Sequence, residues 1–456
     1  MRREKQLGKQ SLTEKTARLI CGFAGTVIPE EAFYRSKIAV MDCVGVALAG
    51  SREPVGRIML DYARSLTGGG EATIWGTAHK VAAVEAALVN GTMSHALDYD
   101  DMNRSMLGHP SAVMVPALFA VAEKMHLSGR KLLEGYIIGL EVMARLGRIF
   151  GPQAYEKSWH PTAVFGVIGA CASTSYLLQL SYDQTLNAIG IAASEASGIK
   201  KNFGSMTKSL HAGSAARKGM WAAMLAEKGL TADAQALDGT FGFMEMFNGR
   251  PYDPEAASDS GKPLEILEPG LVFKQYPCCG GLHSLLDNIL GLRQAEGIKP
   301  EQVAAIECRV HPHKITYLDR PQVQAGLEAK FSIQYCVAAA LCYGKVGLDH
   351  FSEASVVRPE TQTLMRKVRI TSSEELGGFG SEVIVRTLDG REFSSTLSEP
   401  KGSLSFPLTE GELLQKFVDC AMMTMSSSRA EKAGEALMGI EAESHLENII
   451  KLLFSQ

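Results

Sequence analysis

The 456-residue sequence has little excess charge of either sign and no long apolar run. Its net charge of -4 provides no basic field, so we expect neither nucleic acid nor a membrane surface among its partners. The most apolar stretches, 38–50 and 164–178, are interrupted by Asp42 or by glycine and serine, whereas a membrane span needs about 20 predominantly apolar residues. The charged stretch 1–20 does not lead into an apolar run, so we expect no secretory signal.

The sequence also lacks the common cofactor and metal motifs. It contains no H-E-x-x-H, no clustered cysteines for an iron-sulfur centre, no G-x-G-x-x-G and no P-loop. His311 and His313 form only an isolated pair of possible ligands. The nine cysteines are odd in number and contain no C-x-x-C pair, which fits a reducing compartment. We therefore expect a cytoplasmic protein that works without a metal or an organic cofactor.

Helical periodicity dominates the part of the chain from about 12 to 235. Apolar residues recur near the helical period in segments rich in alanine, leucine and methionine. Many of these segments carry alanine and glycine on more than one face, which suits close packing of helices in a large domain. The expected helices lie at 15–25, 31–50, 79–97, 111–126, 129–150, 162–180, 182–198 and 211–229.

The pattern changes after about residue 265. Apolar and polar residues alternate in 303–313, and 381–397 is two strand-like runs joined by Asp389-Gly390, a strong hairpin signal. Helix returns after Thr409, which forms a capping-box pattern with Glu412. The sequence thus predicts a mainly α fold, in which a smaller α+β lid domain is inserted into a large all-helical domain. The expected bounds are 1–266 and 403–456 for the helical domain and 267–402 for the lid, with a strand at 367–371 and a helix at 332–344.

Polar residues gather in four stretches at the borders of the apolar segments. Acids, histidines and lysines together suit proton transfer at a carbon beside a carboxylate. Such a proton is very weakly acidic, so a cation is needed at the developing enediolate, and one such donor contributes roughly 3 to 4 kcal/mol. The stretches are 98–110 with Asp98 and His109, 158–166 with His160, 205–219 with Lys208 and His211, and 273–283 with Lys274 and His283.

Each of these residues also has a purely structural interpretation. Aspartate caps helix ends, and a His-Pro pair can mark a helix entry because proline is favoured in the first turn. Lysine is usually exposed, and cysteines within apolar segments are more often buried and inert than nucleophilic or redox-active. Asp98 could cap a helix end, and His109 and His160 could each mark a helix entry. Lys208 and Lys218 could be surface charges, and Cys278 and Cys279 could be buried and inert.

At these same stretches the sequence resembles the MmgE/PrpD family, which includes 2-methylcitrate dehydratase, cis-aconitate decarboxylase and iminodisuccinate epimerase. The matching segments occur in the family's order over nearly the whole chain. The resemblance implies a large helical domain with an inserted α+β lid, and a cofactor-independent homodimer whose active site lies between the domains. The segments are 86–101, 108–112, 159–166, 207–230, 273–283 and 328–335.

The resemblance also implies site residues. The family's catalytic positions fall on Asp98, His109, His160, Lys208 and Lys274. His283 matches a motif histidine and is expected in substrate binding. Met102 departs from the pattern, because the dehydratases and decarboxylases tend to have threonine there, and the change removes a hydroxyl from the expected substrate-binding wall.

The resulting hypothesis is a lyase, with a hydro-lyase as the leading interpretation, that acts on a small di- or tricarboxylate. Lys208 and Lys274 would bind carboxylates and stabilise the enediolate, His160 or Asp98 would take the proton, and His109 would act as the acid. Decarboxylation and epimerisation stay open, because they need only a different fate for the same carbanion. A catalytically silent carboxylate-binding protein is the alternative of another class.

Overall fold

The computed structural model describes residues 10–150, 153–248 and 263–454, which form two compact units of a mainly α fold. Unit 1 draws its residues from Met1–Ala96, Asp100–Leu271 and Glu410–Gln456. Unit 2 draws its residues from Leu97–Tyr99 and Val272–Thr409. The chain therefore enters unit 2 twice, the first time for a short segment only. The mainly α class that the sequence predicts is confirmed.

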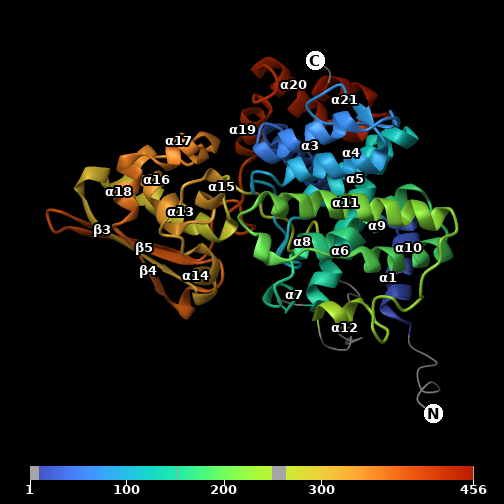
Figure 1. Ribbon diagram of the computed structural model, residues 1–456, viewed down its shortest axis with the longest axis horizontal. Coiled ribbons are helices and arrows are strands. Elements are labelled where there is room, and N and C mark those ends of the chain that lie inside the picture. The colour runs from blue at the N-terminus through green and yellow to red at the C-terminus, as the bar shows by residue number, and fades with distance from the viewer. Residues whose placement is uncertain (1–9, 151–152, 249–262, 455–456) are drawn as a thin grey trace, which may run out of the picture. The chain divides into compact units, whose positions relative to one another are not determined.

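Helix α11 (Met206–Glu227) is the hub of unit 1. It packs against α4 (Ala83–Ser94), α9 (Gly166–Leu177) and α10 (Tyr182–Glu195), as Figure 1 shows. Glycines make the approach possible, since a Cβ at Gly213 would collide with the Leu88 carbonyl oxygen of α4. This close packing of α4, α9 and α11 places polar side chains near one another.

The C-terminal helices complete unit 1. Helix α19 (Glu410–Ala421) packs on α2 (Glu30–Gly50), where Lys416 and Asp42 form a buried ion pair of 2.6 Å. In the described part of the chain, no helix has both the length and the apolar character that crossing a membrane requires. The other helices of unit 1 are α1 (Leu12–Gly22), α3 (Pro54–Ser65), α5 (Ser111–Met125), α6 (Gly129–Phe150), α7 (Gln153–Glu156), α8 (Pro161–Val164), α12 (Phe243–Asn248), α20 (Ser427–Met438) and α21 (Glu447–Phe454).

Several expected helix bounds differ from the structure. The helix expected at 79–97 begins only at Ala83, because Lys80–Val81 forms strand β2 and pairs with β1 (Ala72–Thr73). The helix expected at 162–180 is two helices, α8 and α9, which meet at Phe165. The helical period thus predicts these helices, but strand pairing and packing between distant segments change where they begin and end.

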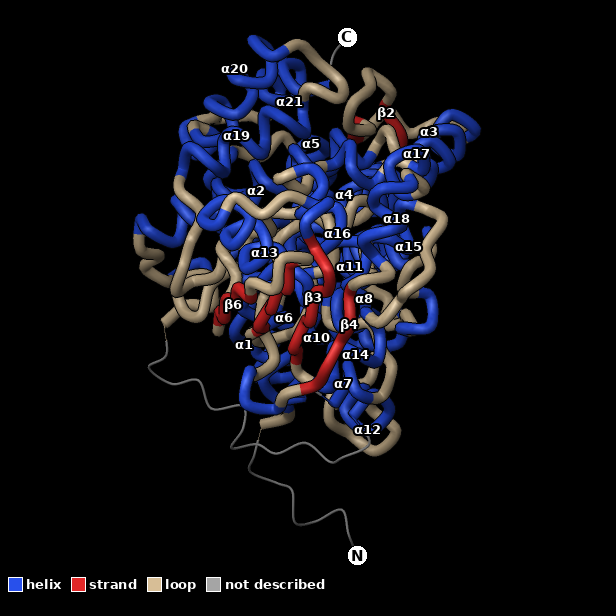
Figure 2. Tube along the Cα trace, turned by 90° about the vertical axis from the view of Figure 1, so that its left-hand side faces the viewer, coloured by secondary structure: helices blue, strands red, loops and turns tan. Residues whose placement is uncertain are grey.

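Unit 2 contains a four-stranded sheet in the order β4-β3-β5-β6, whose strands lie side by side in Figure 2. Strand β3 (Val303–Val310) is parallel to β4 (Val368–Ser372) and antiparallel to β5 (Ser381–Thr387). The expected hairpin is confirmed, since β5 pairs with β6 (Glu392–Leu397) across the turn at Asp389-Gly390.

Helices pack on this sheet. Helix α13 (His283–Glu296) contacts β5 and β6, and α16 (Ile333–Tyr343), where the sequence predicts a helix, contacts α13 and β4. The alternation expected in β3 is present, because Ile306, Cys308 and Val310 are buried. The shorter helices are α14 (Pro312–Leu318), α15 (Gly326–Ala329), α17 (Glu353–Val356) and α18 (Pro359–Met365).

Candidate active site

The core of unit 1 contains an aspartate held between two histidines. His95 is the residue that ends α4, and its Nδ1 lies 2.8 Å from Asp100 Oδ2. His109, two residues before α5, places its Nδ1 3.2 Å from the same oxygen. The rings of His95 and His109 are 4.6 Å apart between centroids, and all three residues are buried. The Asp100 carboxylate therefore orients both imidazoles.

Burial and charge set the protonation of this group. Burial acts to raise the pKa of Asp100, but the two imidazoles outweigh it and hold that pKa well below its usual range. Burial lowers the pKa of His95 to about 4, although Asp100 opposes the change. His95 is thus neutral at pH 7, with its proton on Nδ1 facing Asp100. Its Nε2 is left as an acceptor and has no hydrogen-bond partner among the described residues.

Two further histidines extend this group into a row. The ring of His160 stacks on His95 at 5.6 Å between centroids, and His160 Nδ1 lies 3.1 Å from Nδ1 of His211 on α11. Burial, followed by the neighbouring positive groups, holds the pKa of His160 well below its usual range, and burial with Lys208 lowers the pKa of His211. We define the histidine row as His109, His95, His160 and His211.

The helix-entry interpretation of the His-Pro pairs also holds locally. His160 is the N-cap residue of α8, with Pro161 in the first turn, and His109 precedes Pro110, the N-cap residue of α5. Both imidazoles nevertheless turn into the histidine row. Proline fixes where α8 and α5 begin, and the start of each helix positions the imidazole of the preceding histidine.

Lys208 adds a positive charge beside the row. It lies on α11 three residues before His211, is 6% exposed, and places Nζ 5.4 Å from the centroid of the Phe203 ring. The Phe203 ring in turn packs edge-on against His160 at 4.9 Å. The surface interpretation of Lys208 is therefore wrong.

Unit 2 places Asp98 and Lys274 in one buried ion pair. Lys274 Nζ donates to Asp98 Oδ1 at 2.7 Å and to the Asp98 carbonyl oxygen at 2.8 Å. Asp98 has a positive φ of 52°, an uncommon conformation for a residue other than glycine. Lys330 fixes the same segment by donating to the Leu97 carbonyl oxygen at 2.8 Å. The segment 97–99 is thus held in a strained shape by two buried ammonium groups.

The other residues expected in the site make different contacts. His283 is the first residue of α13, and its Nε2 donates to the Cys278 carbonyl oxygen at 3.3 Å. Burial raises the pKa of the Cys278 thiol well above its usual range, so this cysteine is not an activated nucleophile. Met102 is half-buried in the loop between α4 and α5.

The donor atoms of His95, Asp100 and His109 lie within 4.8 Å of one another, close enough for a metal ion. His95 Nδ1, however, is hydrogen-bonded to the Asp100 carboxylate, and His109 Nδ1 lies 3.2 Å from the same oxygen. The arrangement therefore also suits an acid-base group.

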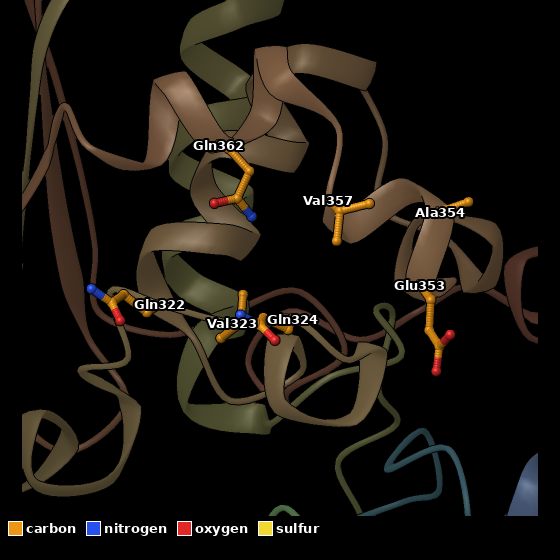
Figure 3. A pocket seen from close by; sticks show the side chains of 7 residues that line it. All are labelled: Gln322, Val323, Gln324, Glu353, Ala354, Val357 and Gln362. Carbon is orange, nitrogen blue, oxygen red and sulfur yellow. The ribbon is translucent and has the colours of Figure 1, made fainter.

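Figure 3 shows a pocket of about 620 Å³ in unit 2. It is lined by glutamines such as Gln322, Gln324 and Gln362, by aliphatic side chains and by Glu353. Among the described residues that line it there is no lysine, arginine or histidine, so they offer no cation for a carboxylate substrate. The histidine row, rather than this pocket, is the candidate active site.

Two residues of the site, His95 and Asp100, were not predicted from the sequence. Both lie in the stretch where α4 ends, whereas His211 is named with Lys208 among the candidate polar residues but without a role of its own. The i, i+5 spacing of a histidine and an aspartate beyond a helix end is a weak signal by itself. What identifies His95 and His211 is their contact with His160, which is distant in sequence from both, and Asp100 is identified by its hydrogen bond to His95.

The chain is similar in sequence to decarboxylases over most of its length and to a dehydratase over about two thirds of it. Cis-aconitate decarboxylase from Homo sapiens is 29% identical over 449 residues, covering 95% of this chain and 92% of the relative. The decarboxylase from Aspergillus terreus is 26% identical over 475 residues, covering 98% and 96%. 2-Methylcitrate dehydratase from Cupriavidus necator is 25% identical over 324 residues, covering 67% and 65%.

Family models give the assignment. The MmgE/PrpD N-terminal domain matches residues 14–255, and the MmgE/PrpD C-terminal domain matches residues 276–440. Because the N-terminal model alone spans more than half of the 456 residues, the chain belongs to the MmgE/PrpD family.

Proposed function

We propose that this chain is a lyase that acts on a small di- or tricarboxylate and moves a proton at a carbon beside a carboxylate. The observation that carries the proposal is the histidine row, in which the buried, neutral imidazoles of His95 and His160 adjoin the positive charge of Lys208. A neutral imidazole is able to accept a proton, and a nearby ammonium stabilises the enediolate that results. The similarity to a decarboxylase and a dehydratase supports the same class of reaction.

The proposed roles in unit 1 follow from position. His160, which stacks on His95 and makes an edge-on contact with the Phe203 ring, exchanges a proton with the substrate carbon. Lys208 binds a substrate carboxylate. A bound anion would raise the pKa of the neighbouring histidines toward neutrality, because it offsets the cost of charging a buried imidazole. His109 supplies the second proton-transfer group, held through Asp100.

In unit 2 we propose that Lys274 binds a carboxylate of the substrate. Its ammonium group is already oriented by Asp98, both by the carboxylate and by the carbonyl oxygen. Such fixed placement is what makes a positive charge effective in a transition state, since little reorganisation is needed during the reaction. In this proposal Asp98 is the residue that orients Lys274. Its alternative role, as the proton acceptor, is tested by variants of Asp98 and Lys274.

For the reaction type, hydro-lyase chemistry is the first candidate. Elimination of hydroxide needs one group that takes a proton from carbon and another that gives a proton to the poor leaving group. His160 and His109 are two such groups in one row. The neutral state of His160 suits the first step.

Decarboxylation of a cis-aconitate-like acid is the second candidate. The decarboxylase relatives match over nearly their whole length, whereas the dehydratase matches over about two thirds. In this reaction carbon dioxide leaves and the same imidazole, in its protonated form, donates to the carbanion. The two candidate reactions use the same residues, but in dehydration the imidazole takes a proton from carbon and in decarboxylation it gives one to carbon.

Product analysis separates the candidates. The protein is incubated in D₂O with citrate, 2-methylcitrate, cis-aconitate and hydroxy- or imino-dicarboxylates, and the products are followed by NMR. We expect reversible alkene formation from a hydroxy-carboxylate. Loss of carbon dioxide with deuterium in a new methylene would favour the decarboxylase, and exchange with inverted configuration would favour an epimerase. If carboxylates bind and none reacts, the lyase proposal is wrong and a silent binding protein is the better interpretation.

A further inference from the structure

The histidine row reaches a small cavity at one end. His160 is 2% exposed, whereas its hydrogen-bonded neighbour His211 is half-buried and lines a cavity of about 80 Å³. Ser197 and Leu210, both exposed, form part of the cavity wall. Because one water molecule needs only about 10 to 15 Å³ of such volume, the cavity has room for several. His211 thus stands between solvent and the buried His160.

The chemistry requires such an exit for protons. This step rests on the proposed function, in which His160 exchanges a proton with the substrate carbon. In dehydration His160 keeps a proton that it must lose before the next turnover. In decarboxylation it gives up a proton that it must regain. Either way, about one proton has to cross the layer of protein around His160 each time, and His160 itself has almost no exposed surface.

We propose that His211 is the proton relay between His160 and water in this cavity. In the releasing direction, His160 takes a proton on Nε2 and passes its Nδ1 proton to the Nδ1 lone pair of His211. His211 then gives its own Nε2 proton to a water molecule. One N–H bond breaks as each new bond forms, so charge and atoms balance. The two rings are left as the opposite tautomers, and a further exchange of protons with water restores the starting tautomers before the next turnover. In the delivering direction the same steps run in reverse.

The geometry of the pair fits this role. The two Nδ1 atoms are 3.1 Å apart, which is hydrogen-bonding distance, and one proton between them satisfies both when the rings are neutral. Each ring is neutral at pH 7, because burial lowers both pKa values. The pair is therefore set to pass a proton in either direction.

The surrounding backbone keeps the pair and the cavity in place. The Gly198 carbonyl oxygen accepts a hydrogen bond from the His160 N–H at 3.0 Å, and a Cβ at Gly198 would lie 3.5 Å from the His211 ring and 2.9 Å from Ala163 Cβ. Lys218 Nζ donates to the Glu195 carbonyl oxygen and to Ser197 Oγ, each at 3.1 Å. This segment forms the wall of the cavity opposite the α11 side chains.

The test removes the relay and replaces it with a soluble base. His211→Ala is expected to lower turnover by about a hundredfold, as for loss of a proton-transfer group, with little change in KM. Added imidazole is expected to restore much of the lost rate, because it fits the enlarged cavity and carries the proton. A purely structural role for His211 would not respond to imidazole. Unchanged turnover, or a loss that imidazole does not restore, would overturn the proposal.

A second variant covers the case in which His211→Ala fails to fold. His211→Asn retains a group that hydrogen-bonds to His160 Nδ1 but does not carry a proton, so it is expected to show a similar loss of turnover with a normal thermal melt. Full activity in that variant would equally overturn the relay.

Matched controls separate the relay from the rest of the mechanism. Leu210→Ala enlarges the same cavity but leaves the imidazole, so its turnover is expected near that of the unchanged protein and insensitive to added imidazole. His160→Gln is expected to lose activity without rescue. If His160→Gln is inactive while His211→Ala is unaffected, the relay fails and the proposed function stands. If His160→Gln is fully active, the proposed role of His160 itself fails.

Discussion

The histidine row of unit 1 and the buried lysines of unit 2 differ in the partners that their nitrogen atoms contact. In unit 1 the neutral rings of His95 and His160 are hydrogen-bonded to Asp100 and His211, so each of these two contacts has a proton that is able to move. In unit 2 the buried lysines point at oxygens that only accept: Lys274 at Asp98, Lys330 at the Leu97 carbonyl and Lys314 at the Gly380 carbonyl, 3.1 Å away. The difference teaches that one set of residues suits proton transfer and the other suits fixed positive charge.

The sharpest way to break this comparison is to remove a proton carrier from unit 1. His160→Gln keeps a polar side chain but is unable to take a proton, so we expect turnover to fall by about a thousandfold. The matched control is His445→Gln, an exposed histidine of the same unit that contacts the His126 carbonyl oxygen. Steady-state kinetics on both, with thermal melts to check folding, give the comparison. Equal activity of the two variants would remove His160 from the mechanism.

The second test acts on the fixed charge of unit 2. Lys274→Met is expected to lower turnover by at least about a hundredfold, as for loss of one preorganised donor. It should also lower the free energy of unfolding by about 3 to 5 kcal/mol, because the buried Asp98 carboxylate loses its ammonium partner.

A double variant separates these two effects. Adding Asp98→Asn removes the uncompensated charge, so Lys274→Met with Asp98→Asn should recover much of the unfolding free energy and none of the activity. Denaturant unfolding and kinetics on the single and double variants measure both quantities. Recovery of turnover in the double variant would show that Lys274 serves only to neutralise Asp98.

The third test uses pH to distinguish the units. The folded pKa of His95 is about 4, below the 6.5 of an unperturbed histidine, so the unfolded chain binds more protons between these values. Stability should therefore fall as pH drops from 6.5 to 4, and the His95 contribution is on the order of 3 kcal/mol. The lowered pKa of His160 acts in the same direction.

Denaturant unfolding across this range checks the expectation. His95→Gln should make the pH dependence shallower by about one proton, because it removes one of the groups that the unfolded chain protonates. The Lys274→Met, Asp98→Asn variant of unit 2 should leave the slope unchanged. A wild-type slope in His95→Gln would mean that this residue is protonated to the same extent in both states.

Local pattern predicts much of the fold. Helical periodicity identifies the mainly α class. The alternation in 303–310 identifies strand β3, and the turn at Asp389-Gly390 identifies the β5-β6 hairpin. The start of α4 was placed too early, because the pairing of Val81 with Ala72 is a contact between residues that no local period reveals.

The site is harder to predict from the sequence, because it too depends on contacts between residues that are distant in the chain. His109 and His160 stand out beside prolines, and their catalytic roles stay predictions. His95, Asp100 and His211 gain their meaning only when α4, α8 and α11 pack together, which brings residues 95, 160 and 211 into one row. Residue type indicates the chemistry, and long-range packing decides which residues perform it.

The smallest expected effect is that of metal removal, and it tests the nature of unit 1 directly. His95, Asp100 and His109 have donor atoms close enough to bind a transition metal, and a bound cation would replace neutral proton carriers by a fixed positive charge like that of unit 2. Since His95 Nδ1 is hydrogen-bonded to the Asp100 carboxylate and His109 Nδ1 lies 3.2 Å from it, we expect exhaustive dialysis against EDTA to leave turnover within about twofold of the untreated value, well below the hundredfold effect of losing one preorganised donor. A strong chelator and its non-chelating isomer, compared at equal concentration, control for inhibition by the chelator itself. A loss of activity that is specific to the chelating compound and is restored by zinc or another divalent ion would contradict the acid-base interpretation, and it would make this group a metal site.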